Sequence, residues 1–268
     1  MDIDVRPITC TSALPGRLPV ICLAAILMLA CMSTTAHAMD QAELDRIIDN
    51  VDRLFRSDTS WARVTMRIET PDWQRSLDME IWTEGLDRTF VRISSPRKEA
   101  GTATLRIENE MWNYFPKINK VMKVPPSMMM SSWMGSDFTN DDLVKESSMK
   151  KDYSGSLLSP PGAEEGFYYV EFIPREDSPI VWGRIVVQVR KQDYIPVRQE
   201  FFDERGRLMR VMVLSDIRPL GGRVIPAVME LIPVNKEGNR TIVTYTDAVF
   251  DKELPADVFS LRNLQKIK

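Results

Sequence analysis

The stretch of sequence that decides the fold runs from Met111 to Leu143 and reads MWNYFPKINKVMKVPPSMMMSSWMGSDFTNDDL. A strand-like aromatic run opens it and is stopped by Pro116, and a basic alternating piece follows from Lys117 to Val124. Two prolines, three consecutive methionines, Trp133 and an acidic turn come next. Because methionine is flexible and polarizable, a cluster of it suits a surface that must fit several apolar shapes. The pattern therefore predicts a movable apolar cover over an apolar cavity.

On both sides of this stretch, apolar and polar residues alternate with the period of two that is typical of half-buried antiparallel strands. The pattern predicts strands at residues 61–69, 77–83, 88–93, 102–107, 167–173, 183–190, 197–203, 208–214, 223–233 and 241–250. Residues 145–166 are polar and turn-rich, and we expect a loop there. About ten strands at this spacing favour a mainly β fold whose sheet curls into a sandwich or an incomplete barrel around a ligand cavity.

A helix is expected before the first strand, over residues 40–56. Its apolar residues recur with the helical period and form one stripe, and acidic residues occupy its first turns. We expect the stripe to pack on the sheet, with a partner-binding helix as the alternative; its members are Leu44, Ile47, Ile48, Val51, Leu54 and Phe55. At the other end, residues 254–261 predict a capped turn that seals an edge or end of the sheet.

The first residues have the pattern of a secretory signal peptide. Arg6 and Arg17 supply positive charge, Val20 to Ala30 is a short apolar run, and Ala36 and Ala38 form an A-x-A cleavage signal. We predict cleavage after Ala38, with residues 1–38 removed and residues 39–268 forming one exported domain. An uncleaved membrane anchor and a lipoprotein signal with lipidated Cys31 are the alternatives.

Cleavage at this point would limit the available chemistry. The cysteines and the single histidine all lie in the removed segment, as Cys10, Cys22, Cys31 and His37. The predicted mature chain therefore has no disulfide, no Cys/His or Ser/His/Asp catalysis and no zinc site with such ligands. The carboxylate pairs Asp141–Asp142 and Glu164–Glu165 are not convincing acid/base sites, so we expect no enzyme activity and no metal.

The charge balance gives no sign of a nucleic-acid partner. The chain has 35 basic and 38 acidic residues and a formal net charge of -3, whereas nucleic acids favour a strongly basic face. At 268 residues with 44% hydrophobic residues, the chain is long enough for one sizeable core.

Candidate ligand contacts follow from the predicted cavity and cover: Met79, Leu105, Ile107, Trp112, Tyr114, Phe115, Met128, Met129, Met130, Trp133, Met134 and Phe138. The residues at 79, 105 and 107 could equally be plain sheet-face residues, and the aromatic pair at 112 and 114 could anchor the sheet. Asp137 is expected to cap the helix that starts near residue 138, with Thr139 as the alternative cap.

Several motifs resemble a known family. They are Gly101-Thr-Ala-Thr-Leu105 followed by Trp112-Asn-Tyr-Phe-Pro116, then Met134-Gly-Ser-Asp-Phe138 and Asp141-Asp-Leu143, with Gly206, Ile225-Pro226 and Leu254-Pro-Ala-Asp-Val-Phe259 in matching order later. In these residues the sequence resembles the outer-membrane lipoprotein-sorting proteins, the relatives of the periplasmic carrier LolA and the receptor LolB. The resemblance covers essentially the whole predicted mature chain.

The resemblance implies an incomplete antiparallel β-barrel closed by helices, an apolar cavity for acyl chains, a periplasmic location and no cofactor. Carriers of this type take lipoproteins from an inner-membrane exporter to an outer-membrane receptor. We therefore expect a monomeric carrier of lipoprotein or lipid acyl chains with an inner-membrane transporter and an outer-membrane acceptor as partners. A periplasmic sensor or regulator, or an accessory subunit of an envelope export complex, would use the same fold.

Overall fold

A computed structural model describes residues 41–55, 57–144, 149–176 and 181–266. It falls into two units, Met1–Glu43 and Leu44–Lys268. The predicted signal peptide, with Ala36 and Ala38, lies outside the described residues. Residues 41–43 of the first unit are helical, and the second unit holds all the strands described below.

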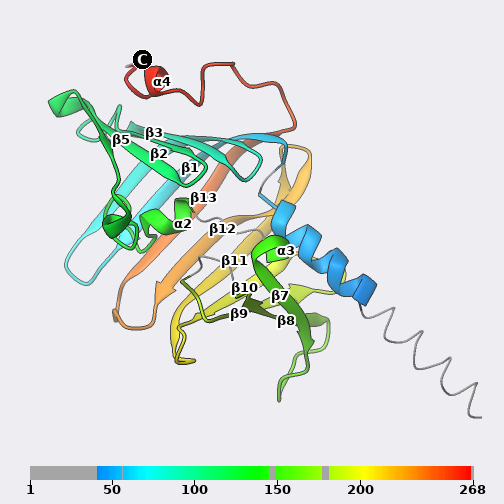
Figure 1. Ribbon diagram of the computed structural model, residues 1–268. Helices are drawn as coiled ribbons and strands as arrows, with labels where there is room; N and C mark the ends of the chain where they lie inside the picture. Colours follow the sequence, from blue (N-terminus) through cyan, green and yellow to red (C-terminus); the bar gives the residue numbers. More distant parts are fainter. Residues whose placement is uncertain (1–40, 56, 145–148, 177–180, 267–268) are drawn as a thin grey trace, which may run out of the picture. The chain divides into compact units, whose positions relative to one another are not determined.

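Within the described residues, thirteen strands form one antiparallel sheet in the order β6-β5-β4-β3-β2-β1-β13-β12-β11-β10-β9-β8-β7 (Figure 1). The strands are β1 (Thr59–Glu69), β2 (Gln74–Glu84), β3 (Arg88–Ser95), β4 (Ala103–Ile107), β5 (Glu110–Phe115), β6 (Lys120–Lys123), β7 (Tyr153–Leu158), β8 (Phe167–Pro174), β9 (Arg184–Arg190), β10 (Pro196–Phe202), β11 (Leu208–Leu220), β12 (Arg223–Pro233) and β13 (Arg240–Phe250). Every neighbouring pair except β1–β13 is consecutive in sequence, so two meanders meet at that one pair.

The alternation in β1 shows why these residues form strands. Val64 and Met66 are buried on one face, opposite Met79 and Leu77 of β2, while the residues between them are more exposed. Apolar side chains directly opposite each other stabilise an antiparallel pair, and they also fix its register.

The barrel prediction is correct only in part. The fold is mainly β and antiparallel, as predicted. The described strands form one open sheet that does not close into a barrel, with β6 and β7 at its edges, and it has thirteen strands where about ten were expected. The predicted strands are present. The aromatic and basic pieces of the central stretch add β5 and β6, and β7 lies in the region expected to be a loop. At the start of the chain, helical structure ends at residue 53, earlier than the predicted residue 56.

Strand β7 was missed because its sequence, YSGSLL, contains small polar residues and a glycine that disfavour strands in general. The structure gives a reason for Gly155. A Cβ there would lie 3.0 Å from Cδ1 of Ile48 and 3.4 Å from Phe172, so glycine lets the N-terminal helix approach β7 closely. The residue that weakens the strand pattern is thus required by the packing above it.

Helical residues 44–53 cover β7 to β10, as the apolar stripe predicts. Leu44, Ile47 and Ile48 are buried in one cluster with Phe172 and Val187. The remaining helical pieces are short: η1 (Pro116–Ile118), η2 (Pro126–Met128), α2 (Asn140–Val144), α3 (Met149–Asp152) and α4 (Leu261–Leu264). In the described part of the chain, no helix has the length and hydropathy needed to span a membrane.

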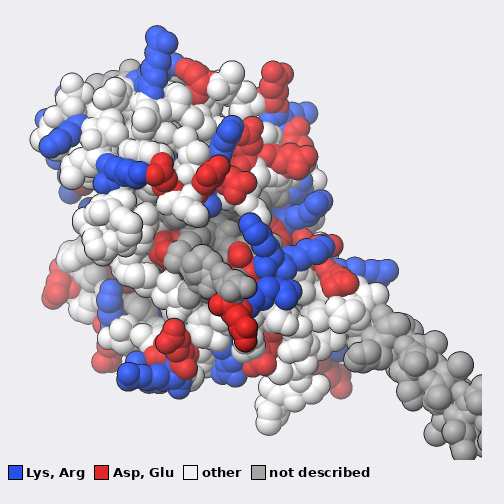
Figure 2. Space-filling view, in the orientation of Figure 1, with Lys and Arg blue, Asp and Glu red and all other residues white. Residues whose placement is uncertain are grey.

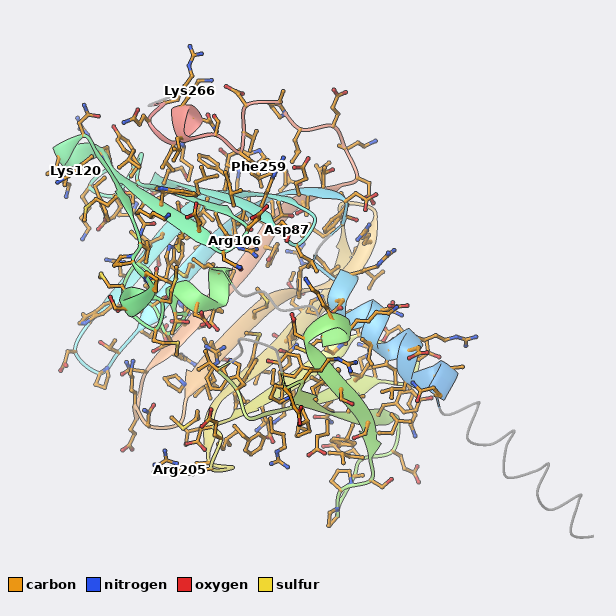
Figure 3. The ribbon with its side chains drawn as sticks, in the orientation of Figure 1. Asp87, Arg106, Lys120, Arg205, Phe259 and Lys266 are labelled. Atoms are coloured by element: carbon orange, nitrogen blue, oxygen red, sulfur yellow. The ribbon has the colours of Figure 1, made fainter. Side chains whose placement is uncertain are left out.

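The C-terminal segment packs on the opposite face of the sheet, over β3 to β5. Val258 and Leu264 are buried against Phe90, Leu105 and Tyr114. Phe259 and Lys266, labelled in Figure 3, lie on this segment. Ser260 caps α4 by accepting a hydrogen bond from the Asn263 N–H, at 3.1 Å, as predicted for a capped turn. The segment covers a face of the sheet, however, and not an edge or end as expected.

Candidate ligand-binding site

The face of the sheet away from the C-terminal segment encloses a cavity of about 320 Å³. Its wall is mostly apolar and combines the sheet with the N-terminal helix and the segment before α2. The residues that line it include Val51, Phe55, Ala62, Val64, Met66, Met79, Ile81, Val91, Trp133, Phe138, Leu143, Phe201, Met212, Leu214, Met229, Val243 and Tyr245. Its size falls within the range of small-molecule pockets, about 300–1,000 Å³.

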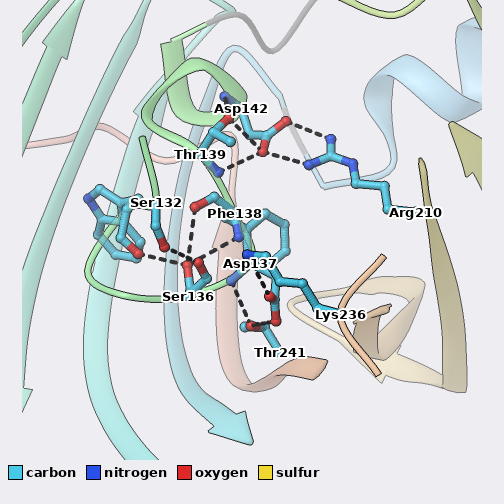
Figure 4. Close-up of polar contacts among 10 residues, drawn as sticks. Ser132, Ser136, Asp137, Phe138, Thr139, Asp142, Arg210, Lys236 and Thr241 are labelled. Atoms are coloured by element: carbon cyan, nitrogen blue, oxygen red, sulfur yellow. Dashed lines mark hydrogen bonds and ion pairs between the residues drawn. The ribbon is translucent and has the colours of Figure 1, made fainter. Parts of the chain in front are cut away.

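Residues 126–144, called the cover segment below, lie over the sheet face that forms the cavity (Figures 1 and 4). Hydrogen bonds from several strands hold its middle, and in one of them the Arg75 guanidinium of β2 donates to the Met134 carbonyl oxygen. The indole N–H of Trp133 donates to Oγ1 of Thr104 on β4, at 3.2 Å. The hydroxyl of Thr241, at the start of β13, donates to Oδ2 of Asp137 at 2.8 Å and accepts from the Asp137 N–H at 3.0 Å.

A further contact joins the end of the cover segment to β11. The guanidinium of Arg210 donates to both carboxylate oxygens of Asp142, at 2.7 and 2.6 Å. The Arg210 side chain is 9% exposed, and its Cζ lies 4.4 Å from the Trp182 ring centroid and 4.5 Å from that of Phe201. A two-pronged, charge-assisted pair of this kind is among the stronger polar contacts in proteins.

These contacts show that the sheet curls. In the strand order, six strand-to-strand intervals separate β4 from β11, which corresponds to about 29 Å across a flat sheet. Trp133 and Asp142 nevertheless reach both strands from one short segment that includes a turn and the start of α2. The sheet must therefore bend toward the cover segment, and the bend creates the cavity between them.

The pair also sets the charge state of Asp142. Burial alone would raise the pKa of its carboxyl, but the hydrogen bonds and charge of Arg210, together with the hydrogen bonds from Thr139, outweigh this effect, and the pKa is lowered. Thr139 adds to the lowering, because its N–H and its hydroxyl both donate to Asp142, at 2.8 and 2.9 Å. Asp142 is therefore held as a carboxylate at neutral pH.

The same atoms form the cap of α2. The Asp142 N–H donates back to Oγ1 of Thr139 at 3.1 Å, so the two residues satisfy each other in the reciprocal pattern of a capping box. Thr139, the alternative of the two predicted caps, is thus the residue in the cap position. Asp137 instead contacts Thr241, with Lys236 3.9 Å away.

The structure separates the sequence-predicted contact residues into groups. Met79, Trp133 and Phe138 line the cavity together. Met129 and Met134 are half-buried and pack against the apolar cluster on this face of the sheet. The remaining two methionines of the run, Met128 and Met130, are 50% and 52% exposed.

Four other candidates lie on the far face of the sheet, beneath the C-terminal segment. They are Leu105, Ile107, Trp112 and Tyr114, and none of them lines the cavity. Phe115 is half-buried and also lies outside the lining. The alternation of apolar and polar residues correctly separates the two faces of each strand, but it does not show which face lines the cavity. The far face is also apolar, because it packs against Val258 and Leu264.

Arg210 was not among the candidates, although the sequence holds a signal for it. It lies on β11 at alternate positions with Met212 and Leu214, and all three line the cavity. A charged residue in register with an apolar face indicates a buried partner. Within the described ranges, no three Asp, Glu, His or Cys side chains gather as a metal site requires.

With this geometry in hand, the chain can be compared with known proteins. A family model with the description "Uncharacterized protein" matches residues 85–266, which is more than half of the chain. The chain belongs to this family. None of the curated proteins matches the sequence.

Among solved structures, the chain is similar in fold to three proteins, one of which is a LolA superfamily protein. A DUF1329 family protein from Desulfovibrio piger superposes with a TM-score of 0.74 at 20% identity, over 84% of this chain and 98% of that one. A putative outer membrane lipoprotein-sorting protein domain from Vibrio parahaemolyticus gives 0.67 at 20% identity, over 84% and 97%. A LolA superfamily protein from Nitrosomonas europaea gives 0.68 at 20% identity, over 82% and 98%. At these identities the likeness establishes the fold alone.

Proposed function

We propose that the protein is a periplasmic carrier that holds the acyl chains of lipoproteins or related lipids in the cavity and moves them toward the outer membrane. The observation that carries the proposal is the apolar cavity of about 320 Å³ between the curled sheet and the cover segment. The fold shared with the putative sorting domain from Vibrio parahaemolyticus supports it. The predicted signal peptide supports the periplasmic location. An inner-membrane transporter and an outer-membrane acceptor would be its partners.

The energetics of acyl chains explain why such a site suits a carrier. Each buried CH₂ contributes about 0.8 kcal/mol, so a sixteen-carbon chain is worth roughly 12 kcal/mol when it leaves water. A carrier must hide that surface and still release it. Apolar burial is non-directional and roughly proportional to area, so a cavity lined by adaptable side chains such as Met66, Met79, Met212 and Met229 meets both needs.

The cover segment supports the proposal because its two sides differ. Trp133 and Phe138 turn an apolar surface to the cavity, whereas its attachments to the sheet include the polar pairs at Asp137 and Asp142. Detachment of the cover would open the cavity, because Trp133 and Phe138 pack on the apolar cluster that forms its wall. The expected loading route is therefore past this segment.

The test blocks the cavity from within the sheet. Met212 lines the cavity, while Val213, its neighbour on β11, is absent from the lining. Met212→Trp should fill part of the cavity and weaken binding of a fluorescently labelled fatty acid at least tenfold. Val213→Trp adds the same bulk to the same strand and should bind the probe as the unaltered protein does.

Two results would contradict the carrier proposal. One is equal probe binding by the Met212→Trp and Val213→Trp proteins. The other is the absence of any acylated molecule in mass spectra of protein purified from the envelope without detergent. Acylated peptides in those spectra would identify lipoproteins as the cargo, and phospholipid would identify free lipid.

A further inference from the structure

The edge of the sheet formed by β6 exposes an unusual amount of apolar surface. Nine large apolar side chains are exposed in the described residues, and four of them lie between positions 118 and 130. They are Ile118, Met122, Met128 and Met130, exposed by 63%, 46%, 50% and 52%. Exposed apolar residues concentrated in one place mark a contact surface rather than ordinary surface scatter.

The charges of the same segment all have one sign. Residues 116–130, called the edge segment below, contain Lys117, Lys120 and Lys123, all exposed, and no acidic residue. Lys123 pairs with Glu110 of β5, which leaves Lys117 and Lys120 as the net positive charge. The turn before β4 approaches the start of the edge segment, because a Cβ added at Gly101 would lie 3.5 Å from Pro116. This turn carries exposed Arg97 and Lys98, and its acidic residue, Glu99, pairs with Arg75.

The tip of the β5–β6 hairpin is held in place. The Tyr114 hydroxyl donates to Oδ1 of Asn119 at 3.1 Å, and Asn119 adopts the left-handed conformation that closes the turn. Ile118 is thereby presented between two lysines by a fixed backbone. In Figure 3, Lys120 lies at this tip, well away from Arg205 in the β10–β11 turn. Figure 2 shows largely uncharged surface on this side, bordered by basic and some acidic side chains.

We propose that the edge segment docks on the surface of an anionic lipid bilayer. Ile118 and the exposed methionines would enter the interface between head groups and acyl chains, and the lysines would contact the anionic head groups. Lysine suits this position because its long stem can lie along apolar surface while its ammonium stays at the polar boundary. A methionine-rich contact also tolerates the irregular surface of a fluid membrane.

The docking surface and the cavity share one stretch of chain. Met128 and Met130 are exposed, whereas Met129 between them packs on the sheet and Trp133 lines the cavity. A bilayer bound to the edge segment therefore contacts the start of the cover segment. Docking would bring the cover segment to the membrane surface that an acyl chain leaves or enters. Docking itself does not depend on the nature of the cargo.

The test measures co-sedimentation of the processed protein, purified from the envelope, with lipid vesicles. We expect binding to vesicles of equal parts phosphatidylcholine and phosphatidylglycerol, weaker binding in high salt, and little binding to phosphatidylcholine alone. Lys117→Gln with Lys120→Gln should weaken binding about 25-fold, on the basis of about fivefold for each lysine near an anionic surface. Met128→Ser with Met130→Ser should weaken it at low salt as well.

Matched controls keep the result specific. Arg205→Gln removes an exposed charge from the β10–β11 turn, and Trp73→Ser removes an exposed apolar side chain, 46% exposed, outside the edge segment. Neither should change binding. The docking proposal fails if the unaltered protein does not sediment with the mixed vesicles, which would leave the edge segment to a protein partner, or if the controls lose as much binding as the edge variants. Met212→Trp should dock normally, so the failure of docking and the failure of the carrier proposal are separate results.

Discussion

Replacing Asp142 by asparagine tests whether the buried ion pair holds the cover segment. The change keeps the shape of the side chain and an oxygen that can accept from the Thr139 N–H, but it removes the charge that faces Arg210. Breaking a buried pair by removing one partner costs about 3–5 kcal/mol. Since Arg210 and Asp142 retain 9% and 16% exposure, we expect the lower end, about 3 kcal/mol.

The double variant gives the sharper measurement. Arg210→Met alone should also destabilise, because it leaves the Asp142 carboxylate buried without its partner. Asp142→Asn combined with Arg210→Met removes both charges, so neither is left buried without its partner, which is the costly situation in each single variant. In urea unfolding followed by tryptophan fluorescence, the double variant should therefore have a higher free energy of unfolding than either single variant. Additive losses would refute the coupling of the two residues across the cavity.

The pair also predicts a pH dependence. The folded-state pKa of Asp142 is lowered below its unfolded-state value, which is about 3.9 for an aspartate. Its stabilising contribution is therefore fully present above that unfolded-state pKa and is lost as the pH falls through the lower folded-state pKa. Asp142→Asn should lose this part of the acid sensitivity. An unaltered acid unfolding curve for that variant would contradict the assignment.

Three further changes test the cover and the far face by urea unfolding. Thr139→Ala removes the cap of α2 and should cost about 1 kcal/mol, whereas Thr139→Ser should restore most of it. Trp133→Phe keeps an aromatic ring but loses the hydrogen bond to Thr104 and part of the buried indole, so we expect a loss of at least about 1 kcal/mol; no loss would mean that Trp133 does not anchor the cover. Leu264→Ala, at a fully buried position on the far face, should cost about 3 kcal/mol while leaving fatty-acid binding unchanged; weakened binding would show that the two faces are coupled.

Much of the sheet could be predicted because its strands repeat a local rule. In β1, alternate residues are buried in the structure as they alternate in the sequence, and β9 follows the same pattern. The rule fails at β7, where Gly155 is needed to admit Ile48 rather than to form a strand. The packing of the N-terminal helix requires this glycine, so the sequence around it gives no sign that the residue lies in a strand.

The candidate site was harder to predict for a reason of geometry. Trp133 could be chosen because an aromatic residue in a polar, proline-broken stretch needs a burial partner, and the structure buries it at the cavity. Leu105 has an equally good strand pattern but faces the C-terminal segment. Which face of a sheet curls inward depends on contacts between distant segments, such as the pair of Asp142 with Arg210, and alternation along one strand does not contain that information.

The pairing of β1 with β13 has a consequence for how the protein assembles. Each of the two meanders is built from hairpins between consecutive strands, which form with short loop closures, and β1–β13 is the seam between them. This seam joins residues almost two hundred positions apart, for example Trp61 and Val249. Long-range pairings of this kind form slowly, so the seam is the natural rate-limiting step of folding. Until β13 pairs with β1, each half of the sheet exposes the apolar residues that later line the cavity. This is the stage of folding at which a chaperone that shields apolar surface would be needed.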